Sequence, residues 1–422
     1  MAQATSGSLS AGFSASDPPT LLHLPRGVLA CIASKFDSPK DRLSLEASCH
    51  TLLAASRGEL SSIYWGGPRL VFSFYSDEDV EDATALLAAR RPTVSALNLE
   101  TSSEIPYDAP LLPSPPLPGL KELRLLVLGF SPPEWDSVLQ HSHLTSLVLA
   151  NCWFYEGAGA QPLRVLNALQ QLEMSGPRDD EGYPVSPPPC LQLAGCSQLT
   201  SLTLSSCDLG DLPPGLTTLS ALCSLHVRCD DLSAAQHWSD LTHLRQLTQL
   251  KLERCYLEEV PEPLSHLTAL RNLWLHANWD LERAWERLAP LTGLTFLSLA
   301  YTQFSHLPAV LSQLTGLETL DLLGCNQLTA SDEAWRPLQG HPSLRFLNAM
   351  WCEGLAAVPA LLSTLRRLED VNFCLSGRLR EGGGWRHLTA LSSLTRLSLT
   401  GCGLQGMPAE LAAFAEAGIA RL

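Results

Sequence analysis

Residues 199–216 read LTSLTLSSCDLGDLPPGL, and this stretch decides the fold. Its leucines fall 0, 3, 5, 10, 13 and 17 residues after the first one, and its cysteine falls 8 residues after it. We call this count the offset. The alternation at offsets 3 and 5 predicts a short strand with one buried face, because successive strand side chains point to opposite faces. The Leu212-Pro213 pair predicts a turn and then a helical or extended return.

The same pattern recurs along most of the chain. Its first position falls at residues 94, 120, 144, 169, 199, 222, 247, 270, 294, 317, 344, 368 and 394. The mean interval of 25 residues lies within the 20–29 residues of leucine-rich repeats. One copy cannot bury its own apolar side, so the copies must stack. We expect an α/β fold: a curved leucine-rich-repeat solenoid of about 13–14 repeats over residues 67–422, with parallel strands on its concave face.

Residues 67–93 predict an atypical first repeat. A strand is expected at 70–74, and a helix begins at Ser76, with acidic residues at 77–79 in its first turn and arginines at 90–91 in its last. These charges complement the two ends of the helix dipole. We therefore interpret the acidic run as capping rather than as a partner-binding patch.

Two proline-rich stretches interrupt the array. Residues 106–118 contain Pro110-x-x-Pro113 and Pro115-x-x-Pro118, which resemble extended SH3-type ligands. A rigid loop on the convex side is the preferred interpretation of this stretch. Residues 177–189 lengthen their repeat to 30 residues and predict an inserted loop, a kind of segment that sometimes carries recognition.

The charge balance excludes one large class of partners. The chain has 28 basic and 43 acidic residues and a net charge of −15. Binding nucleic acid through bulk electrostatics requires clustered Lys and Arg, so we expect no nucleic-acid partner. No stretch approaches the ~18 uninterrupted apolar residues of a membrane span, so we expect no membrane partner. Residues 1–20 lack an apolar core and predict a disordered tail rather than a signal peptide.

The cysteines indicate a reduced compartment. They number 13, an odd count, and no Cys-x-x-Cys occurs among them. None of the asparagines begins an Asn-x-Ser/Thr glycosylation site. An extracellular protein of this repeat class would normally show paired cysteines and such sites. We therefore expect an intracellular protein, cytoplasmic and/or nuclear.

One column of the repeat pattern is polar or sulfur-bearing. Offset 8 is occupied by Cys152, Cys207, Cys255, Cys325, Cys352 and Cys402, and by Asn278 in one repeat. The resemblance to leucine-rich repeats implies that this side chain is buried and bridges the turn backbone of neighbouring repeats. Buried thiols react poorly, so this interpretation is preferred to metal binding or catalysis.

Residues 21–66 do not follow the repeat. Leu24-Pro25 opens a helical pattern with Leu29 and Ile32 on one face, and Ser38-Pro39 begins another helix. We expect a three-helix module at 21–66. About 45 residues are too few to bury a strong core alone, so the module should lean on the solenoid or on a partner.

Residues 24–53, LPRGVLACIASKFDSPKDRLSLEASCHTLL, followed by Trp65, resemble an F-box. Ser48 and Phe36 depart from the family pattern, where Val and Leu are usual. The matching positions are Leu24, Pro25, Leu29, Ile32, Asp41, Leu43, Cys49 and Trp65.

An F-box before leucine-rich repeats is more specific than either signal alone. The combination resembles the F-box/leucine-rich-repeat substrate receptors of SCF-type ubiquitin ligases. It implies that Leu24, Pro25, Leu29 and Ile32 bind the Skp-type adaptor of a cullin ligase complex, and that the repeats bind a protein substrate. A plain helical cap on the open end of the solenoid is the alternative, because repeat arrays need caps.

No motif for chemistry stands out. The sequence has no phosphate-binding P-loop, no nucleophile elbow, no His-Glu-x-x-His and no dinucleotide-binding glycine pattern. His141 and His143 have no third metal ligand nearby in sequence, so a loop histidine pair is preferred. We expect no catalytic residue, no cofactor and no metal site, and therefore no enzyme. Two rival functions stay open: a structural scaffold, for example of the ciliary axoneme, and a recognition protein of the resistance or inhibitor type.

The recognition surface is expected on the concave face, where offsets 2, 4, 6 and 7 point outward. Aromatic residues at these offsets concentrate in the repeats that start at 270, 294 and 344. A polar rim of Lys251, Glu253, Arg254 and Asp370 surrounds them in the pattern. The alternative is that some aromatics pack against each other. The predicted substrate-binding residues are Trp274, His276, Phe296, Tyr301, Phe346, Met350 and Trp351.

Overall fold

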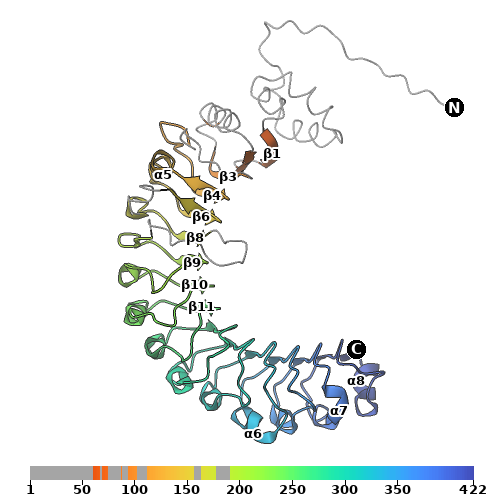
Figure 1. Ribbon diagram of the computed structural model, residues 1–422. Coiled ribbons are helices and arrows are strands. Elements are labelled where there is room, and N and C mark those ends of the chain that lie inside the picture. The colour runs from red at the N-terminus through yellow and green to blue at the C-terminus, as the bar shows by residue number, and fades with distance from the viewer. Residues whose placement is uncertain are drawn as a thin grey trace, which may run out of the picture.

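The strands of this protein line the inner edge of an arc, and turns and short helices form its outer edge (Figure 1). Sixteen strands form one sheet in which spatial order follows chain order, while β5 and β7 pair separately. The computed structural model describes residues 60–66, 69–74, 87, 94–101, 112–155, 163–176 and 191–422.

The strands confirm the repeat pattern. Each predicted copy contributes one strand that begins at offset 2, and all of these strands pair in parallel. Strands β1 and β2 precede these thirteen strands in the sheet, and β18 follows the last of them. The strands of the large sheet are β1 (Leu60–Gly66), β2 (Arg69–Phe74), β3 (Ala96–Thr101), β4 (Glu122–Leu126), β6 (Ser146–Ala150), β8 (Gln171–Ser175), β9 (Ser201–Ser205), β10 (Ser224–Arg228), β11 (Gln249–Glu253), β12 (Asn272–Trp274), β13 (Phe296–Ser298), β14 (Thr319–Asp321), β15 (Phe346–Asn348), β16 (Asp370–Asn372), β17 (Arg396–Ser398) and β18 (Ala420–Arg421), and the small pair is β5 (Gly129–Phe130) and β7 (Trp153–Phe154).

The returns between strands are mostly single turns of 3-10 helix. Proline precedes four of them, because its fixed φ suits a helix start and its missing N–H would have no partner there. The described helices are α5 (Pro132–Leu139), η3 (Leu163–Val165), η4 (Leu216–Thr218), η5 (Trp238–His243), η6 (Glu262–His266), η7 (Trp285–Leu288), η8 (Ala309–Gln313), α6 (Asp332–Trp335), η9 (Arg336–Leu338), η10 (Ala360–Thr364), α7 (Leu379–Gly382), η11 (Trp385–His387), η12 (Ala409–Leu411) and α8 (Ala412–Glu416).

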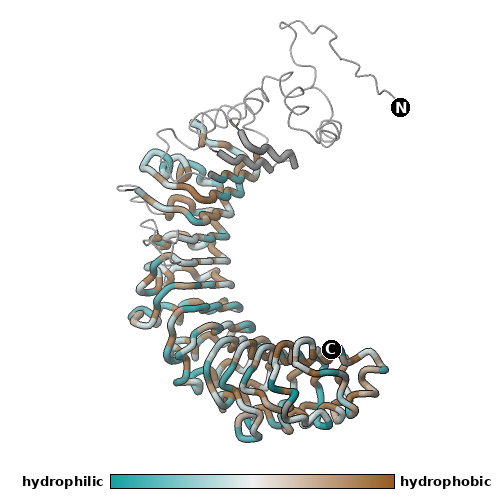
Figure 2. Tube along the Cα trace, turned by 45° about the vertical axis from the view of Figure 1, so that its right-hand side comes forward, coloured by the Kyte–Doolittle hydropathy of each residue, from teal (hydrophilic) through white to brown (hydrophobic). Residues whose placement is uncertain are grey.

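The core is a continuous stack of leucines. Leu202, Leu225 and Leu250, all at offset 3, pair across three adjacent strands in register and are fully buried. Burying one such side chain contributes about 2 kcal/mol. Hydrophobic segments accordingly recur in every coil of the arc (Figure 2). The whole solenoid therefore shares one core that no single repeat could form.

The predicted helical module falls largely outside the described residues. Only Leu60–Gly66 of it is described, and this stretch is strand β1, antiparallel to β2, rather than helix. The strand predicted at 70–74 is present as β2. Of the helix predicted from Ser76, Leu87 alone is described, with helical backbone and full burial. The inserted loop at 177–189 and the four adaptor-binding residues predicted between Leu24 and Ile32 lie outside the described residues.

The offset-8 column forms a hydrogen-bond ladder along the inside of the arc. Each of its six cysteines is buried, and each thiol donates to the carbonyl at offset 5 of the preceding repeat, with Sγ–O distances from 2.9 to 3.6 Å. Burial raises the pKa of Cys152, Cys207 and Cys325 to about 12. All ten described cysteines are free thiols. The ladder thiols therefore serve as weak, unreactive donors.

Asn278 is the strongest rung of this ladder. Its Nδ2 donates to the carbonyls of Leu252 and Leu275 at 2.8 Å, and its Oδ1 accepts from the backbone N–H groups of Cys255 and Leu257. One amide therefore satisfies four buried backbone groups of two adjacent repeats. Removing it would leave those groups without partners, at about 1–3 kcal/mol for each group left unsatisfied.

Asp230 is the exceptional rung. Its Oδ1 accepts from the N–H of Leu209 at 3.0 Å, but its buried Oδ2 has no hydrogen-bond partner. In the pattern this oxygen takes the place of the Asn278 amide nitrogen, which donates to two carbonyls. A carboxylate oxygen cannot donate there, whereas a protonated carboxyl can. Burial, together with the charge of Asp208, raises the pKa of Asp230 to about 6.

Asp230→Asn should therefore stabilise the protein above pH 6. Because the folded pKa exceeds the unfolded value of 3.8, the folded state holds the extra proton, and wild-type stability falls as pH rises from about 4 through 6. The shift corresponds to about 3 kcal/mol at pH 7. Urea unfolding at pH 4.5 and 7.5 measures it: the variant should gain about 1–3 kcal/mol at pH 7.5 and much less at pH 4.5. A gain of the same size at both pH values would refute the protonated rung.

Candidate protein-binding face

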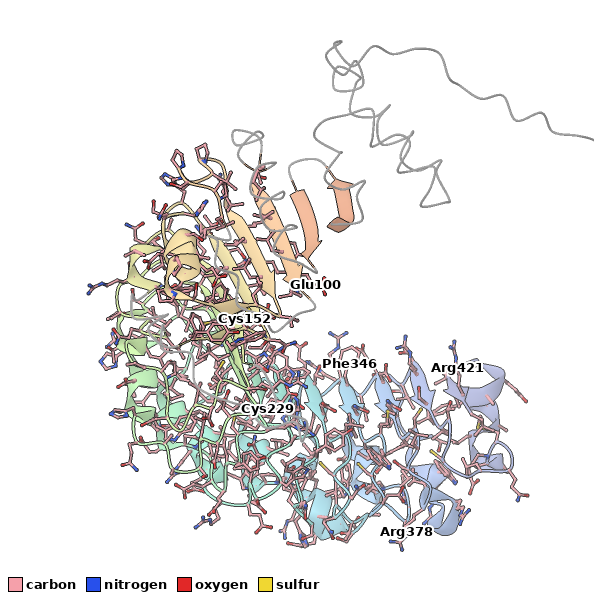
Figure 3. All side chains as sticks on the ribbon, turned by 45° about the horizontal axis from the view of Figure 1, so that its top comes forward. Glu100, Cys152, Cys229, Phe346, Arg378 and Arg421 are labelled. Atoms are coloured by element: carbon pink, nitrogen blue, oxygen red, sulfur yellow. The ribbon has the colours of Figure 1, made fainter. Side chains whose placement is uncertain are left out.

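The predicted binding residues lie together on and just after strands β12 to β15. Phe346 faces the opening of the arc, whereas Arg378 lies on the opposite side (Figure 3). Phe346 and Trp351 are 38% and 44% exposed. The other predicted residues are half-buried: Trp274, His276, Phe296, Tyr301 and Met350.

One aromatic pair joins two adjacent strands. The rings of Trp274 in β12 and Phe296 in β13 lie 4.6 Å apart between centroids, with planes tilted by 38°. The ammonium of Lys251 in β11 lies 4.5 Å above the Trp274 ring. Such cation–π contacts contribute about 0.5–1 kcal/mol at exposed sites. These two aromatics therefore pack mainly against each other and against Lys251.

A second aromatic pair spans three repeats. The rings of Tyr301 and Trp351 lie 6.0 Å apart in an edge-to-face arrangement. The repeat between them has Gly324 at the same offset, and a Cβ on this glycine would stand 2.6 Å from the Tyr301 ring. The glycine is therefore required here, since it lets the tyrosine ring cross the intervening repeat and reach the tryptophan.

Both members of this pair sit at offset 7, where the backbone is left-handed. A residue with a side chain loses about 1–2 kcal/mol in this conformation, whereas glycine does not. Bulky residues in such a column are strained, and strain of this kind clusters at functional sites. The residues at offset 7 with positive φ are Val127, Asn151, Ser206, Cys229, Arg254, Ala277, Tyr301, Gly324, Trp351, Leu375 and Gly401, with φ from 53° to 75°.

His276 belongs to a charged cluster rather than to the aromatic surface. Its Nε2 lies 3.0 Å from the Glu253 carboxylate, which also contacts His226 at 3.3 Å and Arg228 at 3.0 Å. Hydrogen bonds from His226 and His276 hold the pKa of Glu253 well below its usual range. Glu253 therefore stays ionised and fixes two side chains of strand β10 and His276, which follows β12.

The offset-4 row on strands β13 to β15 is polar and internally bonded. Ser298 Oγ and Asn348 Nδ2 both donate to the Asp321 carboxylate at 2.8 Å. Backbone N–H groups that follow these strands donate to Asp321 and Asn348. These polar groups are therefore already satisfied by bonds within the protein.

Three exposed apolar residues escaped the sequence analysis. Tyr256 and Trp279 stand at offset 9 and are 48% and 37% exposed, and Leu375 stands at offset 7 and is 47% exposed. The signal that finds them is the aromatic or leucine side chain at an offset that usually carries small or polar residues. Together with three further offset-7 residues, Arg254, Tyr301 and Trp351, these residues form what we call the rim.

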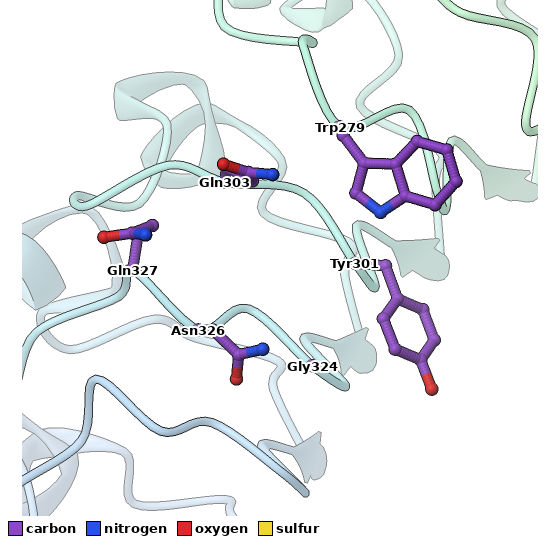
Figure 4. Close-up of a pocket in the computed structure, with 6 residues that line it drawn as sticks. All are labelled: Trp279, Tyr301, Gln303, Gly324, Asn326 and Gln327. Carbon is purple, nitrogen blue, oxygen red and sulfur yellow. The ribbon is translucent and has the colours of Figure 1, made fainter.

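A small hollow opens on the rim. It has a volume of about 250 Å³. Trp279 and Tyr301 stand on one side of it, and three amide side chains stand opposite (Figure 4). We call it the slot; its lining residues are Trp279, Tyr301, Gln303, Gly324, Asn326 and Gln327.

No group of His, Cys, Asp or Glu that could hold a metal ion occurs in the described ranges. His141 is a buried structural residue: its Nε2 accepts from the N–H of Leu117 and its Nδ1 donates to the carbonyl of Ser137. Among the described helices, none has the length and apolar character to span a bilayer.

Comparison with known proteins identifies the fold. No protein-family model and no curated protein matches the chain. Among solved structures, a leucine-rich-repeat protein of Leptospira interrogans is 17% identical over 83% of this chain and 87% of its own, with a TM-score of 0.54. TLR13 in its complex with ssRNA13 is 18% identical over 78% of this chain and 50% of its own, with a TM-score of 0.52. An internalin of Listeria monocytogenes is 19% identical over 68% of this chain and 82% of its own, with a TM-score of 0.48. At these identities the likeness concerns the fold alone: the chain is a leucine-rich-repeat solenoid.

Proposed function

We propose that this protein is a non-catalytic receptor that binds a partner protein on its concave face and rim between β11 and β16. The observation that carries the proposal is the pair Tyr301 and Trp351, which hold bulky rings in a strained backbone conformation where glycine would fit. The left-handed backbone recurs at offset 7 along the arc, so the size of the two aromatic side chains is what distinguishes this pair, and contact with a partner would explain why they are retained.

The distribution of exposed apolar residues supports the same face. Tyr256, Trp279, Phe346, Trp351 and Leu375 are large, exposed hydrophobic residues, and all belong to the four repeats that start at 247, 270, 344 and 368. Clusters of this kind mark interaction sites, and Trp and Tyr dominate the residues that carry binding energy. The charged groups of Lys251 and Arg254 lie next to these apolar residues, and a polar border of this kind is typical of protein interfaces.

We further propose that the receptor serves an SCF-type ubiquitin ligase. The support is the F-box-like sequence at 24–53, placed directly before the repeats. Leu24, Pro25, Leu29 and Ile32 would bind the Skp-type adaptor, and the concave face would hold the substrate for ubiquitin transfer by another subunit. A structural scaffold, for example in the ciliary axoneme, would use the same face without any ligase.

Trp274→Ala/Trp351→Ala tests the binding face. Loss of the two aromatic residues should weaken capture of the protein partner from cell extract by about thirtyfold or more, because even one anchor of this kind contributes about 2 kcal/mol. Quantitative mass spectrometry of the captured proteins measures the loss. Val165→Ala, an equally exposed apolar residue in η3, is the matched control and should retain the partner. Unchanged capture by the double variant would place the site elsewhere, with the loop at 177–189 the next to examine.

Leu24→Ala/Pro25→Ala tests the ligase role. The variant should lose the adaptor in a pull-down with purified components while its circular-dichroism spectrum and its concave-face partner stay unchanged. Arg26→Ala, the adjacent polar position, is the control that should keep the adaptor. Failure of well-folded wild-type protein to bind the adaptor would end the ligase proposal and leave the receptor proposal standing.

A further inference from the structure

A positively charged patch occupies the concave face over strands β10 and β11 and the residues that follow β11 and β12. We call it the basic patch; its members are Arg228, Lys251, Arg254, His226, His276 and Glu253. The carboxylate of Glu253 already contacts Arg228 and both histidines at 3.0 to 3.3 Å. The charges of Lys251 and Arg254 are therefore left uncompensated within the patch, although the net charge of the chain is −15.

Lys251 and Arg254 are held in place by aromatic rings rather than by acids. The Lys251 ammonium lies 4.5 Å above the ring of Trp274, and the Arg254 guanidinium lies 5.7 Å from the ring centroid of Trp279. Within the part of the chain that the structure describes, neither cation has a carboxylate within ion-pair distance. A cation on a ring face keeps N–H donors that point away from the ring, so both side chains can still bind an anion.

The neighbouring strands determine what can lie on either side of an anion bound to the patch. On the N-terminal side, Glu100 in β3 and Glu173 in β8 are exposed acids, which would repel further negative charge. On the C-terminal side lie the rings of Phe296 in β13 and Phe346 in β15. A ligand that is negatively charged along its whole length, such as a nucleic acid, therefore fits this face poorly. A ligand with one acidic site next to apolar groups fits it well.

We infer that the basic patch binds an Asp or Glu side chain of the partner protein, within a segment whose neighbouring apolar residues pack on the aromatic strands β12 to β15. This inference rests on the proposed receptor function and specifies the class of segment that the receptor recognises. Complementary charge of this kind speeds association and excludes ligands of the wrong sign, while the aromatic rings supply apolar contact area.

A library of random 12-residue peptides displayed on phage, selected on the full-length protein, tests the inference. Enriched sequences should combine Asp or Glu with adjacent apolar residues. A labelled peptide of the best sequence should lose about tenfold or more in affinity for Lys251→Gln/Arg254→Gln, measured by fluorescence anisotropy, because charge-assisted contacts are lost. The matched control is Arg164→Gln/Arg245→Gln, which removes the same charge from two exposed arginines, one in η3 and one after η5. This control should bind the peptide like wild type.

Charge reversal provides the sharper arm. Lys251→Glu/Arg254→Glu should reject the acidic peptide and accept a version in which lysine replaces its acids, because the ligand charge must then be reversed. Circular dichroism checks that this variant is folded, and the Gln variant carries the test if it is not. Enrichment of basic or uncharged sequences, or displacement of the labelled peptide by a single-stranded RNA oligonucleotide of mixed sequence, would overturn the inference. If capture of the cellular partner still depends on Trp274 and Trp351 in that case, the receptor function survives and only this class of segment is wrong.

Discussion

The hydrogen bond from an offset-8 side chain to the offset-5 carbonyl of the preceding repeat, formed by six cysteines, Asn278 and Ser376, is the constraint on which the structure depends. Each strand is only a few residues long, and the chain must then turn sharply inside a core made of leucine. A carbonyl left unsatisfied in that core costs several kcal/mol. Thiols, the Asn278 amide and the Ser376 hydroxyl all donate to this carbonyl, whereas Leu128 has no donor and Thr302 donates to Leu299 of its own repeat. Asp230 can donate a hydrogen bond to this carbonyl only when its carboxyl group is protonated.

The turn that follows each strand also determines which side chains are exposed at the edge of the concave face. Because the chain leaves the strand just before offset 8, the residue at offset 7 takes a left-handed backbone and its side chain projects from the edge of the concave face. Gly324 and Gly401 occupy this position without strain, whereas Tyr301 and Trp351 do not. The fold therefore supplies a column of positions where stability favours glycine and where every large side chain opposes folding. Large aromatic side chains at offset 7 occur in the repeats that start at 294 and 344.

The periodicity of leucine predicted the fold in detail. Counting from residues such as Leu199 placed every strand of the thirteen copies correctly, because a buried repeat leaves no freedom in register. The surface was less predictable. The pattern shows that Trp274 and Phe296 lie on the concave face, but only coordinates show that they stack on each other. Likewise His276 is engaged by Glu253 of the preceding repeat, a contact that depends on rotamers rather than spacing. Trp279 was missed because its offset lies beyond the strand, where the turn geometry decides exposure.

We propose that Trp351 is retained for binding and not for folding, and one substitution separates these two roles. Trp351→Gly relieves left-handed strain of about 1–2 kcal/mol and removes the edge contact with Tyr301 and the partial burial of the indole, and these terms oppose each other. The measurement is the urea-unfolding free energy of the variant, paired with its affinity for the captured partner. The account predicts stability within about 1 kcal/mol of wild type and a clear loss of affinity. A variant that loses several kcal/mol of stability but binds the partner normally would contradict it.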